Sequence, residues 1–175
     1  MKSSLAMYIT FAPALILAAG VNEAVQRAFP EAQTLEKVAL ALSDVERSFI
    51  KEKTGSPWPS KELSLFVARS GGRLLGYAVE DNVKGKDLPI TYLMAVSPDL
   101  RVKGVEILAY REAYGSEVRN SSWLRQFTGK SMLDALRPGK DIRSISGATI
   151  SAQAVTFGVK RVLVVLDLLR VRLPR

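Results

Sequence analysis

The chain has 175 residues, the size of one domain with enough material for a substantial core. Its formal net charge is +8, but the basic residues are scattered among acidic ones, so the sequence argues against nucleic-acid binding and favours an anionic membrane surface or an anionic cofactor. Cysteine and histidine are both absent from the sequence, which excludes disulfides, iron–sulfur clusters, the usual zinc sites and Ser-His-Asp catalysis. Any chemistry would therefore depend on an imported cofactor.

The N-terminus combines a positive start at Lys2 with an uncharged run over residues 5–20, interrupted by Pro13. The run is slightly short for a membrane-spanning helix, which needs about 20 residues, and is typical of a signal peptide. Small residues allow cleavage after Gly20; an uncleaved anchor is the close alternative, and a buried helix is a third. We expect residues 1–20 to be a signal peptide or membrane anchor and residues 21–175 to be the folded domain, outside the cytoplasm.

Residues 21–55 are predicted to form helix in two pieces, broken at Phe29-Pro30. Apolar residues of the second piece recur at three- and four-residue steps, as on one face of an amphipathic helix. These residues are Leu35, Val38, Leu42, Val45 and Phe49.

Four strands are predicted beyond this helical region, over residues 63–68, 73–79, 90–96 and 102–110. Turn signals separate the first two and the last two, which indicates hairpins. Residues 81–89 are the expected longer connection between the hairpins. Short turns between consecutive strands predict an antiparallel meander and not βαβ units.

The C-terminal third is predicted to be irregular at first, with a short helix over residues 131–136. A long final helix follows from Ile150, and its residues 162–166 are apolar on every side. One face should pack on the sheet, leaving another for a partner or a membrane. The predicted fold class is α+β: an antiparallel sheet of four to six strands with packed helices, preceded by the signal or anchor helix.

A turn of small residues joins a β-branched and basic run, residues 141–145, to the final helix. It comprises Ser146, Gly147, Ala148, Thr149, Ile150 and Ser151. The N-terminus of a helix exposes unpaired N–H groups and a partial positive charge, which attract phosphate. A hydroxyl at that position can bind a phosphate or be esterified by one. The alternative is an ordinary Ser/Thr helix cap.

Several segments, taken together in order and spacing, resemble the FMN-binding domain shared by the G subunit of the Rnf electron-transport complex and the C subunit of sodium-translocating NADH:quinone reductase. The resemblance runs from about residue 25 to about residue 168. The segments that carry it are residues 76–77, 81–86, 89–92, 102–108, 110–115, 123–130 and 146–151.

The resemblance implies that Thr149 accepts FMN through a phosphoester bond, installed from FAD by a separate, magnesium-assisted flavin transferase. One departure concerns Arg143, which stands where the family has an acidic residue three positions before the serine. Asp141 lies two residues further upstream and cannot take that place without a shift of the chain. Arg143 could instead pair with the FMN phosphate, and whether the FMN is covalent is therefore left open.

The family's flavin-lining segment corresponds to residues 111–115. It implies that Glu112 lies near the flavin or its ribityl chain, beside Gly115. Tyr114 and Trp123 offer flat apolar faces for the isoalloxazine ring. Core packing is the alternative for Trp123, and a surface charge is the alternative for Glu112.

The function implied by the resemblance is electron relay through FMN at the extracytoplasmic face of the cytoplasmic membrane or in the periplasm. Its expected partners are membrane redox proteins, the flavin transferase and, if the N-terminal segment stays uncleaved, the membrane itself. Such a relay need not be a substrate-specific enzyme. The alternative is a scaffold module of a membrane redox assembly, either flavin-free or binding FMN non-covalently. A reductase with its own small substrate is a second alternative.

Overall fold

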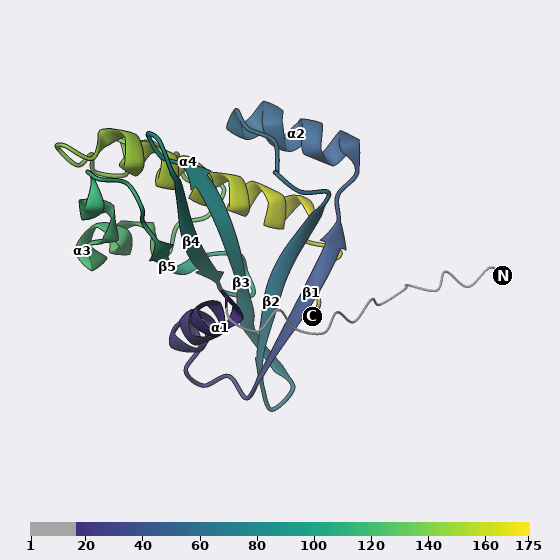
Figure 1. Ribbon diagram of the computed structural model, residues 1–175. Helices are drawn as coiled ribbons and strands as arrows, with labels where there is room; N and C mark the ends of the chain where they lie inside the picture. The colour runs from purple at the N-terminus through teal and green to yellow at the C-terminus, as the bar shows by residue number, and fades with distance from the viewer. Residues whose placement is uncertain (1–16) are drawn as a thin grey trace.

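The computed structural model describes residues 17–175, so most of the predicted signal or anchor segment, residues 1–16, lies outside the described residues. The described chain forms a five-stranded sheet in the order β1-β2-β3-β4-β5, every pair antiparallel, with helices on both faces (Figure 1). The strands are β1 (Thr34–Ala41), β2 (Glu62–Ser70), β3 (Arg73–Lys84), β4 (Pro89–Val96) and β5 (Val102–Ala109). The helices are α1 (Leu17–Ala28), α2 (Asp44–Thr54), α3 (Ser121–Leu124) and α4 (Thr149–Leu168), with 3-10 turns η1 (Ser116–Arg119) and η2 (Arg125–Phe127). The predicted α+β fold with an antiparallel meander is confirmed.

The two faces of the sheet carry separate cores. Successive strand residues point to opposite faces, so Met94 of β4 packs in the cluster that includes α4, while Leu93 packs in the cluster that includes α1. Ala24 and Val25 of α1 are fully buried against the second face. The predicted boundary after Gly20 therefore falls inside α1, a helix whose following turns are part of the folded domain.

Helix α4 is the central helix of the larger core. Residues 162–166 are all buried inside the domain. The prediction that one face of this stretch is left for a partner or a membrane is therefore wrong. Among the described residues α4 alone is long and apolar enough to cross a membrane, but 67% of that stretch is buried inside the domain. Its apolar character is therefore explained by its place in the core.

The prediction of two helices over residues 21–55 is wrong for its middle part, which forms β1. Leu35 and Val38 would share one face of a helix, but in β1 they point to opposite faces of the sheet, Leu35 toward α1 and Val38 toward α4. Residues 34–41 form a strand and not a helix because they pair with β2 along their whole length. Helix α2 then begins after Ser43, which forms a capping box with Glu46.

The longer connection predicted over residues 81–89 is also wrong, because β3 continues to Lys84 and pairs with β4 from Pro89. A buried polar cluster allows the acidic residue Asp81 to lie within this strand. The Arg161 guanidinium donates to both Asp81 carboxylate oxygens at 3.0 and 2.8 Å, and the Tyr92 hydroxyl donates to Asp81 at 2.8 Å. Burial and the neighbouring Asp81 carboxylate raise the pKa of Tyr92 well above its usual value.

The predicted helix over residues 131–136 is absent, and turns occupy the segment. Leu136 has a φ of +45°, which no right-handed helix accommodates. Its N–H donates to the carboxylate of Asp141 at 3.0 Å, and that of Arg137 does so at 2.8 Å. The Asp141 carboxylate therefore fixes the backbone conformation of Leu136 and Arg137.

Candidate functional site

The turn before α4 has the predicted geometry. Residues 146 and 147 form a turn in which Gly147 has a φ of +80°, a conformation that glycine adopts without strain. The Ala148 N–H donates to the Ile145 carbonyl at 3.1 Å and closes the turn. Helix α4 begins at Thr149, its N-cap is Ala148, and no side chain caps it. The alternative of an ordinary Ser/Thr cap is therefore not what the structure shows.

Thr149 is exposed, as are Ser146, Gly147 and Ile150 around it. Its hydroxyl makes only a long hydrogen bond, 3.5 Å, to the Ile145 carbonyl. The N–H groups of the first helical turn have no intrahelical acceptor, and they concentrate the positive end of the helix dipole. A phosphate can therefore meet a hydroxyl and several N–H donors here.

Ser151 is the other hydroxyl in the first turn of α4, and it is only 4% exposed. Its Oγ lies 2.9 Å from the Tyr110 hydroxyl, which also donates to the Tyr114 carbonyl. Gly115 packs against this pair, because a Cβ there would lie 2.7 Å from the Tyr110 hydroxyl oxygen. The structure thus turns Ser151 inward and leaves Thr149 at the surface.

Arg143 is exposed, while its backbone is held at both ends. Its N–H donates to Gln126 Oε1 at 2.8 Å, and its carbonyl accepts from the Trp123 indole N–H at 2.7 Å. Gln126 also donates to the Trp123 carbonyl at 3.0 Å, closing a small network. The Arg143 Nε donates to the same Gln126 oxygen at 3.4 Å, and no carboxylate of the described chain lies within ion-pair distance of the guanidinium, so its terminal nitrogens can meet an anion. The sequence pointed to Arg143 but not to Gln126, because a lone glutamine in an irregular segment carries no recognisable signal.

Asp141 does not replace the missing acidic residue beside the turn. Its carboxylate accepts hydrogen bonds from two backbone N–H groups of its own loop and from the Lys130 ammonium at 3.1 Å. Burial alone would raise the pKa of Asp141, but these donors outweigh burial and lower it to about 2. The carboxylate is therefore committed to holding residues 130–141 together.

Trp123 and Tyr114 have opposite environments, although the resemblance implied the same role for both. Trp123 is 5% exposed and packs edge-on against Phe127, with ring centroids 5.3 Å apart. Core packing, the alternative for this residue, is what the structure shows, because its ring faces are covered. Tyr114 is 84% exposed, so a face of its ring is free for a ligand.

Glu112 braces the turn between β3 and β4. Its Oε1 accepts from the backbone N–H groups of Asp87 at 2.8 Å and Leu88 at 3.0 Å. The bonds from Leu88 and Asp87 lower the pKa of Glu112 below its usual value. The carboxylate therefore ties the 111–115 loop to the sheet, and its contact with a ribityl chain stays a prediction.

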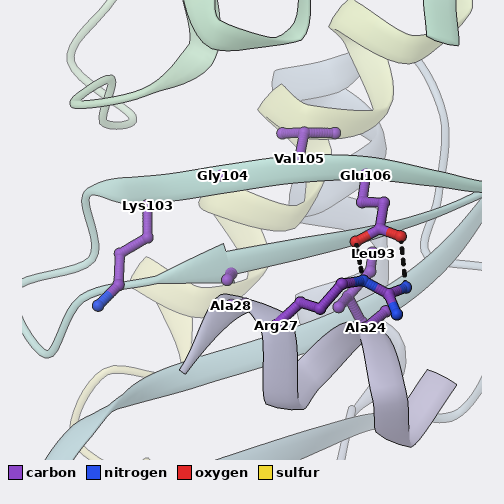
Figure 2. A pocket seen from close by; sticks show the side chains of 9 residues that line it. Ala24, Arg27, Ala28, Leu93, Lys103, Gly104, Val105 and Glu106 are labelled. Carbon is purple, nitrogen blue, oxygen red and sulfur yellow. Dashed lines mark hydrogen bonds and ion pairs between the residues drawn. The ribbon is translucent and has the colours of Figure 1, made fainter. Parts of the chain in front are cut away.

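A groove of about 290 Å³ lies on the other face of the sheet, between α1 and strands β4 and β5 (Figure 2). The Arg27 guanidinium spans it to the Glu106 carboxylate at 2.6 Å (Figure 2). None of the predicted site residues lines this groove. The candidate site is thus the exposed surface formed by the turn, the start of α4 and the 110–115 loop.

Comparison with known proteins identifies the family of this chain. Residues 85–164 match the FMN-binding domain family. The G subunit of the Na(+)-translocating ferredoxin:NAD(+) oxidoreductase complex of Acetobacterium woodii is 31% identical over 144 residues, covering 77% of this chain and 68% of that protein. The G subunit of the proton-translocating ferredoxin:NAD(+) oxidoreductase complex of Clostridium ljungdahlii is 35% identical over 103 residues, covering 54% of this chain and 55% of that protein. The chain thus spans about two thirds of the first relative and about half of the second.

The solved structures extend the comparison to the fold. The crystal structure of Shewanella oneidensis NqrC superposes with a TM-score of 0.60 at 16% identity, covering 84% of this chain and 86% of that one. This chain belongs to the FMN-binding domain family, and its cofactor is FMN. The turn fits the phosphate end of that cofactor, since it offers an exposed hydroxyl with one long hydrogen bond and uncapped N–H groups, and Arg143 lies three residues before Ser146 in the chain.

Proposed function

We propose that this protein is an electron-transfer subunit of a membrane redox complex, with FMN attached to Thr149 through a phosphoester bond. The observation that carries the proposal is the exposed Thr149 hydroxyl at the start of a helix without a side-chain cap. The relatives, which are G subunits of oxidoreductase complexes, support the first part of the proposal, a subunit of a redox complex.

Each residue of the site would make a different contact with the cofactor. Thr149 Oγ1 would carry the phosphate, the first N–H groups of α4 would donate to its free oxygens, and Arg143 would neutralise its charge. The exposed ring of Tyr114 gives the flavin an apolar face. When bound, FMN supplies the redox chemistry that this chain lacks, and the protein contributes its position and electrostatic surroundings.

Intact mass tests the attachment. When the protein is coexpressed with a flavin transferase, the Thr149 hydroxyl would take the FMN part of FAD with release of AMP, so the protein should gain the mass of one FMN less one water. Thr149→Ala should abolish the gain. Ser146→Ala is the matched control, because it removes another exposed hydroxyl from the same turn and should keep the flavin. Flavin retained in Thr149→Ala and mapped to Ser146 would contradict the assignment, and wild type without any flavin would leave only reversible binding.

We further propose that the N-terminal segment directs export, so that the domain works at the extracytoplasmic face of the membrane beside membrane redox proteins. The uncharged run behind Lys2 motivates this placement. A reporter active only outside the cytoplasm, fused after Arg175, should function. Activity of a cytoplasm-dependent reporter alone would contradict the placement.

The flavin-free scaffold is the competing function. Arg143 in the family's acidic position favours it, whereas the burial of α4 removes the apolar docking helix on which it would depend. Purified protein from a host with the transferase is yellow under the relay proposal and colourless under the scaffold alternative.

A further inference from the structure

Tyr110, directly after β5, connects the loop and the helix that flank the attachment site. Its hydroxyl donates to the Tyr114 carbonyl at the far end of the loop. The same hydroxyl lies 2.9 Å from Ser151 Oγ in the first turn of α4. One phenol group therefore joins the 110–115 loop to the helix that starts at Thr149.

The directions of these hydrogen bonds follow from the number of protons available. A tyrosine hydroxyl has one proton to donate, and a carbonyl oxygen can only accept. Since Tyr110 donates its proton to the Tyr114 carbonyl, Ser151 must donate to Tyr110. The Ser151 proton is thereby committed, and its oxygen is buried, so Thr149 is left as the accessible hydroxyl in the first turn of α4.

Gly115 shows how closely the loop approaches this hydroxyl. Its φ of +88° disfavours other residues. A Cβ would also lie 2.7 Å from the Tyr110 hydroxyl oxygen and 3.1 Å from Ser151 Oγ. The loop is thus fitted onto the Tyr110–Ser151 pair and has little room to shift.

We propose that Tyr110 is a positioning residue that clamps the 110–115 loop onto the first turn of α4, so that the loop and the Thr149 hydroxyl present one prearranged surface to FMN. This inference rests on the proposed attachment at Thr149. Loop preorganisation matters because a mobile loop would have to be ordered when the cofactor binds.

The first test compares Tyr110→Phe with Tyr114→Phe in the full chain. Both remove one tyrosine hydroxyl, but that of Tyr114 makes no hydrogen bond within the described residues. Tyr110→Phe should speed amide hydrogen exchange over residues 112–118 about five-fold, the effect of losing roughly one ordinary hydrogen bond. With limiting transferase it should also lower the initial rate of flavin attachment by about two- to five-fold, with a fall in melting temperature of no more than about 2–4 °C, while Tyr114→Phe leaves exchange at the wild-type value.

A second variant makes the test specific to this contact. Gly115→Ala should open the loop, because its Cβ meets the Tyr110 hydroxyl oxygen. Adding Tyr110→Phe removes that oxygen and with it the clash. The amide hydrogens of residues 112–118 should therefore exchange more slowly in the double variant than expected from multiplying the fold-changes of the two single variants.

Three outcomes decide the proposal. Unchanged exchange in Tyr110→Phe overturns the clamp, and faster exchange with an unaltered rate of attachment overturns the positioning role. Wild type that takes up no FMN refutes the proposed function instead, and the exchange comparison then still decides whether Tyr110 holds the loop.

Discussion

Thr149 at the start of α4 and Arg161 in its middle are both polar, yet their surroundings differ. Arg161 is 8% exposed, and its terminal nitrogens bond Asp81, the Asn82 carbonyl at 3.0 Å and Ser56 Oγ at 3.3 Å. Its guanidinium also lies over the Trp58 ring, 5.5 Å from the centroid. Thr149 is exposed, with one long hydrogen bond.

The difference separates a polar group whose partners lie within the fold from one whose hydrogen-bonding capacity is open at the surface. A buried charge is tolerated when its partners are built into the protein, as for Arg161. Hydrogen-bonding capacity left open at the surface, as in the first turn of α4, can be used by a cofactor. Variants in the first region should therefore change stability, and variants in the second should change flavin content.

The largest effect is expected from Asp81→Ala, which leaves the Arg161 charge buried without its partner. The free energy of unfolding should fall by about 3–5 kcal/mol, measured by urea denaturation. The matched control Asp87→Ala, an exposed carboxylate on the following turn, should change it by less than about 0.5 kcal/mol. An apolar replacement of the pair, Asp81→Leu with Arg161→Met, should recover much of the loss, and no recovery would contradict the desolvation argument.

Trp123→Ala should lower the free energy of unfolding by about 3 kcal/mol, because the ring is buried and its N–H holds the Arg143 carbonyl. Tyr114→Ala should cost less than about 0.5 kcal/mol but shift the visible flavin spectrum, since its ring is exposed. Equal losses of melting temperature would mean that the two rings do not differ as the structure indicates.

Asp141→Asn should destabilise the protein by about 2 kcal/mol at neutral pH, because it weakens charge-assisted bonds from Lys130 and two backbone N–H groups. The pKa of Asp141 falls from an ordinary 3.8 to about 2 on folding, so the stability that it contributes is complete above pH ~4 and is lost as the pH falls toward 2. Melting temperatures between pH 5 and pH 2 should decline less steeply in the variant than in wild type. Parallel curves would contradict this assignment.

Arg143→Asp should have the smallest effect on stability, below about 0.5 kcal/mol, because its side chain is exposed. It restores the acidic position of the family, so the flavinylated fraction with limiting transferase should rise if Arg143 impairs attachment. Reversible FMN binding should weaken in the same variant, since a carboxylate repels the phosphate that the guanidinium attracts. Wild type already fully modified would show that the transferase tolerates Arg143.

The sequence by itself determined the elements whose signals are local. Apolar runs divided by turn residues predicted β2, β3, β4 and β5, and an apolar segment behind a small-residue turn predicted α4 and its start near Thr149. An exposed hydroxyl at the start of α4 was predictable for the same reason, because turn, helix start and hydroxyl are adjacent in the chain, and its role as FMN acceptor stays a prediction.

Tertiary structure decided what depends on residues far apart in the chain. Residues 34–41 are a strand because β2 pairs with them, and Asp81 lies within a strand because Arg161 and Tyr92 meet it from other elements. Trp123 is core and Tyr114 is surface only because of what packs on each. Ser151 is buried beside Tyr110 while Thr149 is exposed, and the distance between Tyr110 and Ser151 in the sequence hides their contact. Local periodicity carries no information on such partners, since burial and hydrogen-bond satisfaction arise only when the chain is folded.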